Sequence, residues 1–230
     1  MSARSTSPKR VFVTGATGYL GRALVGALLE RGHAVRALVR DSQRARLPSE
    51  VELVAGDALD AATFTERVRG SDVLVQLVGT RKPAPWKAES FRRVDRASAL
   101  ASLEAALAAD VPHYVYLSVA QPAPVMRAYV AVRAECEARI AASGIAATFV
   151  RPWYVIGPGH RWPLALAPLY AVLERVHATR ASAVRLGLVR LEHVVAALVD
   201  AVEHPPRGVR VVETEELRAR NVTATGPWVE

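Results

Sequence analysis

The stretch VFVTGATGYLGRALVGALLERGHAVRALVR, residues 11–40, contains the features that decide the fold. A short Val-rich run leads directly into Gly15, Gly18 and Gly21, and an apolar helical period follows before a second Val-rich run. Short β-branched runs indicate buried strands, and glycine permits a tight turn between a strand and a helix. The stretch therefore predicts one strand–helix–strand unit of a parallel sheet.

The same alternation continues along the chain. Helical periods separate further short apolar runs, and a long alanine- and leucine-rich helix is expected over 89–109. The runs predicted as strands are RVFVT, HAVRALVR, VELVAG, DVLVQLVG, HYVYLS, AATFVR and, near the end, GVRVVE. Right-handed crossovers between such strands favour an α/β fold with a doubly wound parallel sheet, of the Rossmann type, covered by helices on both faces.

Composition limits the partners and the environment. The chain has 30 Lys and Arg against 22 Asp and Glu, a formal net charge of +8, but the arginines are scattered without basic runs or interleaved aromatic residues. Nucleic acid is therefore an unfavoured partner. No apolar run approaches the ~18 residues of a membrane-spanning helix. Cys136 is the only cysteine, which suits a reducing compartment, so we expect a cytoplasmic protein.

The glycine turn suggests a nucleotide site. With this spacing the first glycine permits the turn, the second lets the backbone approach a pyrophosphate, and the third lets the helix pack closely on the strand. The helix N-terminus then offers N–H groups to the phosphates. Arg40 stands after the second strand, where NAD sites usually place an acid, and its guanidinium suits a 2′-phosphate. NADP(H) is favoured, while the adjacent Asp41 keeps NAD(H) as an alternative.

Several motifs together resemble a known family. TGATGYLG, the arginine after the second strand, GDALD, LVQLVGT and LEHVVAALVDAV are similar to the atypical branch of the short-chain dehydrogenase/reductase superfamily, in particular its NmrA-like and complex I accessory-subunit-like group. The resemblance covers about residues 10–205. The glycine turn and the resemblance together imply these cofactor-binding residues: Gly15, Thr17, Gly18, Tyr19, Leu20, Gly21, Arg40, Asp57, Ala58, Leu77, Val78, Gly79 and Pro152.

The same features set the expected domain boundaries. Residues 10–215 are predicted to form one NAD(P)-binding Rossmann domain, in which residues 151–205 contribute a small portion on the substrate side. Residues 1–9 are predicted to be a disordered leader, and residues 216–230 a tail.

The resemblance also implies a catalytic set. Active members of the superfamily use a serine after the fifth strand and a Tyr-x-x-x-Lys pair, in which tyrosine transfers a proton while lysine lowers its pKa and holds the nicotinamide ribose. Here Ser118, Tyr129 and Arg133 take these positions, so lysine is replaced by arginine. Arginine keeps the charge but not the geometry of lysine. Two interpretations stay open: a working Tyr129 and Arg133 pair, or two plain helix-surface residues beside the cofactor.

Two functions follow from these residues. The first is an NADPH-dependent reductase, or an epimerase or dehydratase relative, acting on a small carbonyl or hydroxyl compound. The alternative is a protein that binds NADPH without turnover, as a redox sensor or as an accessory subunit that needs a protein partner or a second copy of the chain.

Further candidates are weaker. Aromatic residues in two irregular segments either line an apolar ligand site or pack the C-terminal portion onto the sheet: Trp86, Trp153, Tyr154 and Trp162. His160 is expected near the same possible ligand site. No histidines in the sequence have metal-ligand spacing. Glu135 and Glu137 are expected to face solvent. An apolar helix over 162–176 carries Leu164, Leu169 and Leu173, for which core packing is favoured over a partner surface.

Overall fold

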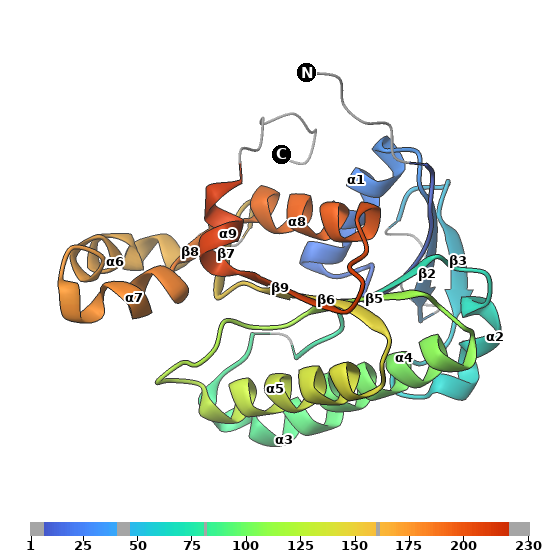
Figure 1. Ribbon diagram of the computed structural model, residues 1–230, viewed down its shortest axis with the longest axis horizontal. Coiled ribbons are helices and arrows are strands. Elements are labelled where there is room, and N and C mark those ends of the chain that lie inside the picture. The colour runs from blue at the N-terminus through green and yellow to red at the C-terminus, as the bar shows by residue number, and fades with distance from the viewer. Residues whose placement is uncertain (1–6, 41–46, 81, 160–161, 221–230) are drawn as a thin grey trace.

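A seven-stranded parallel sheet forms the centre of the protein (Figure 1). The computed structural model describes residues 7–40, 47–80, 82–159 and 162–220. The strand order is β3-β2-β1-β4-β5-β6-β9, and each neighbouring pair is parallel. The strands are β1 (Arg10–Thr14), β2 (Ala34–Val39), β3 (Glu52–Ala55), β4 (Val73–Gln76), β5 (His113–Leu117), β6 (Ala146–Arg151) and β9 (Val209–Glu213). The predicted doubly wound α/β fold is confirmed.

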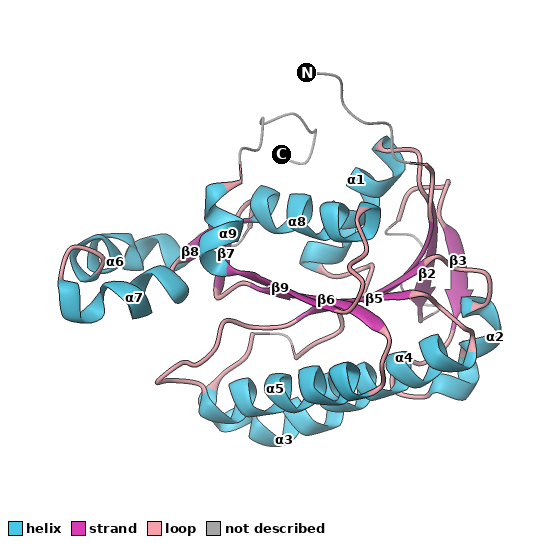
Figure 2. Cartoon of the chain, viewed as in Figure 1, coloured by secondary structure: helices cyan, strands magenta, loops and turns pink. Residues whose placement is uncertain are grey.

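Helices cover both faces of this sheet (Figure 1 and Figure 2). One layer contains α1 (Tyr19–Glu30), α8 (Leu191–Glu203) and α9 (Thr214–Ala219). The other contains α2 (Thr65–Val68), α3 (Ala88–Ser90), α4 (Ala97–Ala108) and α5 (Arg127–Ala142), with the short 3₁₀ turns η2 (Ala61–Thr63) and η3 (Pro85–Lys87). Each layer has its own apolar core: one includes Leu24 and Leu198, and the other includes Phe91 and Ile140. Within the described ranges, no helix is both long and apolar enough to cross a membrane.

The long helix expected over 89–109 contains an irregular turn. A π-helical segment, η4 (Phe91–Arg96), separates α3 from α4. Such turns widen a helix locally and often occur at functional sites. Here the segment places the carboxylate of Asp95 inside the protein, where the side chain is fully buried.

The chain after β6 forms a smaller unit. It comprises β7 (Tyr154–Ile156), which pairs in parallel with β8 (Leu188–Arg190), and η5 (Trp162–Leu166), α6 (Ala167–Leu173) and α7 (His177–Arg185). The prediction that the apolar helix over 162–176 packs into the core is wrong. Leu164 and Leu169 are 47% and 54% exposed, because α6 and α7 pack on each other beyond the sheet.

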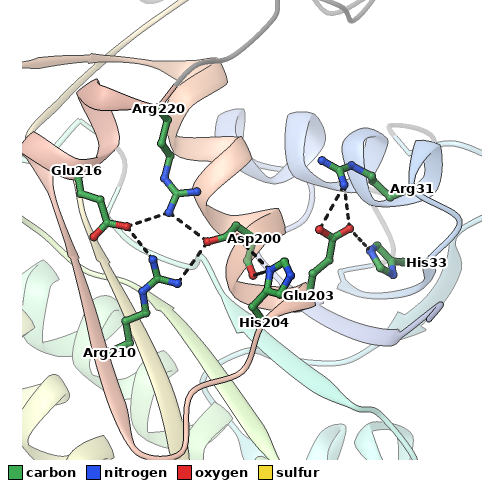
Figure 3. A network of polar contacts seen from close by, with 8 residues as sticks. All are labelled: Arg31, His33, Asp200, Glu203, His204, Arg210, Glu216 and Arg220. Carbon is green, nitrogen blue, oxygen red and sulfur yellow. Dashed lines mark hydrogen bonds and ion pairs between the residues drawn. The ribbon is translucent and has the colours of Figure 1, made fainter. Parts of the chain in front are cut away.

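A surface network ties α9 to the rest of the fold (Figure 3). Asp200 on α8 accepts hydrogen bonds from Arg210 at 3.3 Å and Arg220 at 3.1 Å, and Glu216 accepts from the same two arginines. Leu217 on α9 is fully buried. The folded chain therefore continues beyond residue 215, where the sequence predicts a tail. Residues 221–230 and leader residues 1–6 lie outside the described part of the chain.

Candidate active site

The residues predicted to bind a cofactor follow the carboxyl ends of the strands. The strand order reverses between β1 and β4, which are neighbours in the sheet although β2 and β3 separate them in the chain. Ligands of open parallel sheets bind at the carboxyl ends of the strands at such a point. Arg40 follows β2, Asp57 follows β3, Leu77 follows β4, and Ser118 follows β5. The fold thus brings these positions to one edge of the sheet.

The glycine turn after β1 packs against the end of β4. Gly15 has a φ of +77°, and a Cβ atom there would lie 2.9 Å from both the carbonyl carbon of Leu77 and the amide nitrogen of Val78. A Cβ at Gly21 would lie 2.2 Å from the carbonyl oxygen of Gly15. Both positions therefore require glycine, for conformation at the first and for close packing at both.

The helix that follows this turn has an open N-terminus. Gly18 is the N-cap of α1 and its amide donates to the carbonyl oxygen of Gly15 at 3.0 Å. Among the residues described, no side chain caps α1, and its first turn contains no acidic residue. Unpaired N–H groups and the positive end of a helix dipole attract an anion. The tight glycine cradle and the uncapped helix fit the pyrophosphate of a dinucleotide.

The adenosine side of the candidate site lies at β2 and β3. Arg40 is exposed immediately after β2. Asp57 and Ala58 form a turn after β3, in which the Asp57 carboxylate accepts the amide of Leu59 at 3.0 Å and the Asp57 amide donates to the hydroxyl of Thr63 at 3.0 Å. The carboxylate of Asp57 therefore shapes the turn. Asp41, which favours the NAD(H) alternative, lies outside the described residues.

A buried glutamine orders the end of β4. The side-chain oxygen of Gln76 accepts from the hydroxyl of Thr14 and from the amide of Val78, the latter at 3.1 Å, while its amide nitrogen donates to Ser98 at 2.9 Å. These bonds join β1, β4 and α4 beside the glycine turn. Sequence reasoning missed Gln76, because a single polar residue in an apolar strand gives no spacing signal.

Arg133 is buried in an ion pair. The residue is 4% exposed, and Nη2 lies 2.6 Å from Oδ1 of Asp95. Nη1 donates to the carbonyl oxygen of Leu117 at 2.8 Å and to the hydroxyl of Tyr116 at 3.3 Å. The interpretation of Arg133 as a helix-surface residue is therefore wrong. Asp95 of η4 and the carbonyl oxygen of Leu117 at the end of β5 hold its side chain inside the protein.

Asp95 connects this ion pair to the loop after β4. Its second oxygen accepts from the backbone amide of Thr80 at 3.0 Å and from the Thr80 hydroxyl. A Cβ at Gly79 would lie 2.4 Å from Nη2 of Arg133, so the small residue makes room for the guanidinium. Sequence reasoning also missed Asp95, because it stands among arginines in a segment that reads as an exposed helix.

Tyr129 lies one helical turn from Arg133 on α5, as its spacing predicts. The guanidinium carbon of Arg133 is 5.2 Å from the centre of the tyrosine ring, and the ring of Phe91 is 4.9 Å away. Burial raises the pKa of Tyr129; the Arg133 charge opposes this and the Asp95 charge adds to it. The buried phenol therefore holds its proton more strongly than a tyrosine in water does.

Ser118 presents a buried hydroxyl at the end of β5. The residue is 4% exposed, and its backbone amide donates to the carbonyl oxygen of Val150 at 2.8 Å. Within the described part of the chain, its side-chain oxygen has no hydrogen-bond partner. Pro152, which directly follows β6, is also buried. Its carbonyl oxygen accepts a hydrogen bond from the backbone amide of Ala120 at 3.1 Å. A buried hydroxyl without a partner is costly, and a bound ligand would satisfy it.

The prediction that Glu137 faces solvent is wrong. Its carboxylate is buried, where it pairs with Arg151 at the end of β6 and accepts a hydrogen bond from the side-chain amide of Gln121 at 2.7 Å. These two partners compensate the carboxylate for the water that it loses on burial. Glu135 is exposed, as expected, and pairs with Arg96 at 2.7 Å.

The predicted aromatic mouth is only partly assembled. The rings of Trp153 and Tyr154 lie 5.8 Å apart and edge to face, whereas Trp86 is 83% exposed. Trp86 therefore does not pack the C-terminal portion onto the sheet. His160 and the side chain of Trp162 lie outside the described residues.

Comparison with known proteins supports the nucleotide site. A family model described as NAD(P)H-binding matches residues 15–160. A ceramide reductase of Caulobacter vibrioides is 32% identical over 94% of this chain and 67% of its own length. A 3-diazoavenalumate denitrifying reductase of a Streptomyces species is 31% identical over 90% of this chain and 76% of its own length.

A solved structure shows the same fold. The Bordetella bronchiseptica enzyme WbmH, in complex with NAD+, superimposes with a TM-score of 0.66 at 22% identity. The match covers 87% of this chain and 74% of that one.

Proposed function

We propose a function from the premise that this chain belongs to the NAD(P)H-binding family, in the atypical branch of the short-chain dehydrogenase/reductase superfamily. It is an NAD(P)-binding protein of the oxidoreductase type. The finer proposal is an NADPH-dependent reductase that reduces a carbonyl group in a largely apolar compound. The observation that carries it is the placement of Tyr129 against Arg133, whose guanidinium donates to the carbonyl oxygen of Leu117 directly before Ser118.

Cofactor binding is assigned to the strand ends. Gly15, Gly18 and Gly21 would hold the pyrophosphate, and Arg40 would pair with the 2′-phosphate of NADPH. Asp57 and Leu77 belong to the turns that would border the adenosine. When bound, NADPH supplies a hydride to the substrate carbon. The exposed guanidinium of Arg40 supports NADP(H) over NAD(H).

The chain's own residues supply the proton and the orientation. The Ser118 hydroxyl would donate a hydrogen bond to the carbonyl oxygen of the substrate. This bond would give the buried hydroxyl the partner that it lacks among the described residues. Tyr129 would transfer its proton to that oxygen as negative charge develops there. Arg133 acts as a positioning residue, because its polar contacts hold Asp95, Tyr116 and the end of β5. Its role in this proposal differs from the ribose contact of the lysine in relatives.

The substrate class follows from the relatives and the aromatic residues. Both relatives are reductases, and one of them is a ceramide reductase, named for a lipid. Trp153 and Tyr154 stand directly after Pro152 on the substrate side. We therefore expect a carbonyl compound with a long alkyl chain or an aromatic ring.

The single buried cysteine supports a cytoplasmic location.

The test follows NADPH absorbance with a panel of alkyl and aromatic aldehydes and ketones. We expect turnover with apolar members, and Tyr129→Phe should lower kcat by about 100-fold or more while NADPH affinity stays unchanged. Ser118→Ala should lower kcat less. Binding of NADPH without turnover of any compound would contradict the reductase and favour the non-catalytic alternative. Failure to bind either dinucleotide would contradict the cofactor site itself.

The non-catalytic alternative has its own supporting observation. Arg133 replaces lysine, and its guanidinium is already committed to Asp95. A sensor or accessory subunit needs a bound nucleotide but no proton transfer, so it would tolerate this arrangement. Turnover that appears only in Arg133→Lys would favour the alternative.

A further inference from the structure

The hairpin formed by residues 164–185 exposes apolar side chains that the fold does not use. Figure 1 shows its helices α6 and α7 together at one end of the molecule, outside the two helix layers of the sheet. The exposed fractions are 47% for Leu164, 54% for Leu169, 58% for Val172 and 47% for Val176. Four exposed large apolar residues within one short hairpin are a feature of interaction surfaces.

The same hairpin contains a positively charged hollow. The hollow has a volume of about 320 Å³ and is lined by Ala171, Glu174, Arg175, Arg180 and Val184. The carboxylate of Glu174 accepts from Arg218 of α9 at 2.7 and 3.4 Å, so its charge is already balanced. Arg175 and Arg180 are exposed, and no carboxylate in the described ranges pairs with either. The hollow is thus positive beside an apolar surface.

We propose that this hairpin docks the protein on the surface of an anionic lipid bilayer. Exposed leucine and valine side chains beside arginines are the composition of interfacial membrane-binding segments. The apolar residues would enter the boundary of the acyl chains, while Arg175 and Arg180 bind lipid phosphates. A second copy of the chain fits less well, because its hairpin brings the same positive charge and the chain carries a net charge of +8. The inference does not depend on the reaction proposed above.

The test is co-sedimentation of the full chain with vesicles of two compositions. One is phosphatidylcholine alone, and the other is an equimolar mixture with phosphatidylglycerol. We expect tighter binding to the anionic vesicles and release by high salt. The double variant Arg175→Glu with Arg180→Glu should lose at least about 25-fold in affinity, because each arginine contributes about fivefold near such a surface.

Matched variants separate this hairpin from general effects. Arg67→Glu with Arg92→Glu makes the same charge change at exposed arginines of α2 and η4, and should bind nearly as the wild type does. Leu169→Ser with Val172→Ser should weaken binding, whereas Leu107→Ser with Val209→Ser, at residues 44% and 45% exposed, should not. Thermal unfolding of each variant verifies that it folds.

Three results would overturn the proposal. One is no preference for anionic vesicles. Another is equal loss of binding in the two charge-reversed pairs, which would assign the effect to net charge alone. The third is self-association that Leu169→Ser with Val172→Ser abolishes, without vesicle binding by the wild type, which would mean that a second copy covers the hairpin.

Discussion

Oδ1 of Asp95 lies 2.6 Å from Nη2 of Arg133, and both side chains are withdrawn from water. This pair joins the π-helical turn η4 to α5, and through Thr80 it also fixes the loop after β4. A buried ion pair is costly to break, because the remaining charge loses both water and its partner. The pair therefore ties α5, which carries Tyr129, to the loop that follows β4.

The first prediction concerns the stability that this pair contributes. Arg133→Met should lower the free energy of unfolding by about 3–5 kcal/mol, because it leaves the Asp95 carboxylate buried without a cation. Asp95→Leu combined with Arg133→Met should cost less than the sum of the two single changes. Urea unfolding of the three variants measures this double-mutant cycle.

A more exposed ion pair between the same two elements, η4 and α5, provides the control. Arg96 and Glu135 lie 2.7 Å apart with side chains 37% and 43% exposed. Arg96→Met should cost at most about 1 kcal/mol, because water screens such pairs. Similar losses for Arg96→Met and Arg133→Met would contradict the assigned importance of the buried pair.

The second prediction concerns the proton of Tyr129. Burial raises its pKa, and the negative charge of Asp95 raises it further against the opposing charge of Arg133. Asp95→Asn removes that negative charge and leaves Arg133 uncompensated, so the pKa of Tyr129 should fall. Ultraviolet difference titration measures this, with Tyr129→Phe in each background as the blank. An unchanged or raised tyrosine pKa in Asp95→Asn would contradict the proposed electrostatic coupling.

The sequence predicts the glycine turn well and the buried charges poorly, for a physical reason. Gly15 and Gly21 act through local backbone geometry, which their spacing already encodes. The role of Arg133 depends on Asp95, which is 38 residues away in the chain and on a different helix. Glu137 likewise reads as exposed until β6 brings Arg151 to it. Only tertiary structure supplies such partners, so periodicity assigns these side chains to solvent.

The third prediction concerns the choice of cofactor. Arg40→Ala should weaken NADPH binding by about 10-fold or more, because a charge-assisted hydrogen bond to the 2′-phosphate is lost. NADH affinity should stay nearly the same, since NADH lacks that phosphate. Calorimetric titration of both dinucleotides measures the difference, and Arg67→Ala, an exposed arginine on α2, is the control. Equal losses for NADPH and NADH would remove the argument for a 2′-phosphate contact.

The fourth prediction concerns the acid sensitivity of the fold. His113 on β5 is buried, and Nε2 lies 3.1 Å from the Thr148 hydroxyl. Burial, with a smaller effect of the Lys9 charge, lowers the pKa of His113 to about 4. The unfolded chain binds this proton near pH 6.5, so the contribution to stability is complete above that pH and is lost as the pH falls toward 4. Between pH 7 and pH 5 the loss should be about 2 kcal/mol.

His113→Asn isolates this contribution, because it removes the titrating group while keeping a polar side chain beside Thr148. Urea unfolding at both pH values should show a loss of stability that is smaller in the variant by about 2 kcal/mol. Val115→Ala, at a buried residue of the same strand that does not titrate, tests whether lowered stability alone changes the pH dependence. It should lose as much stability on acidification as the wild type. If His113→Asn and the wild type lost equal stability, the acid sensitivity would have to arise from other groups.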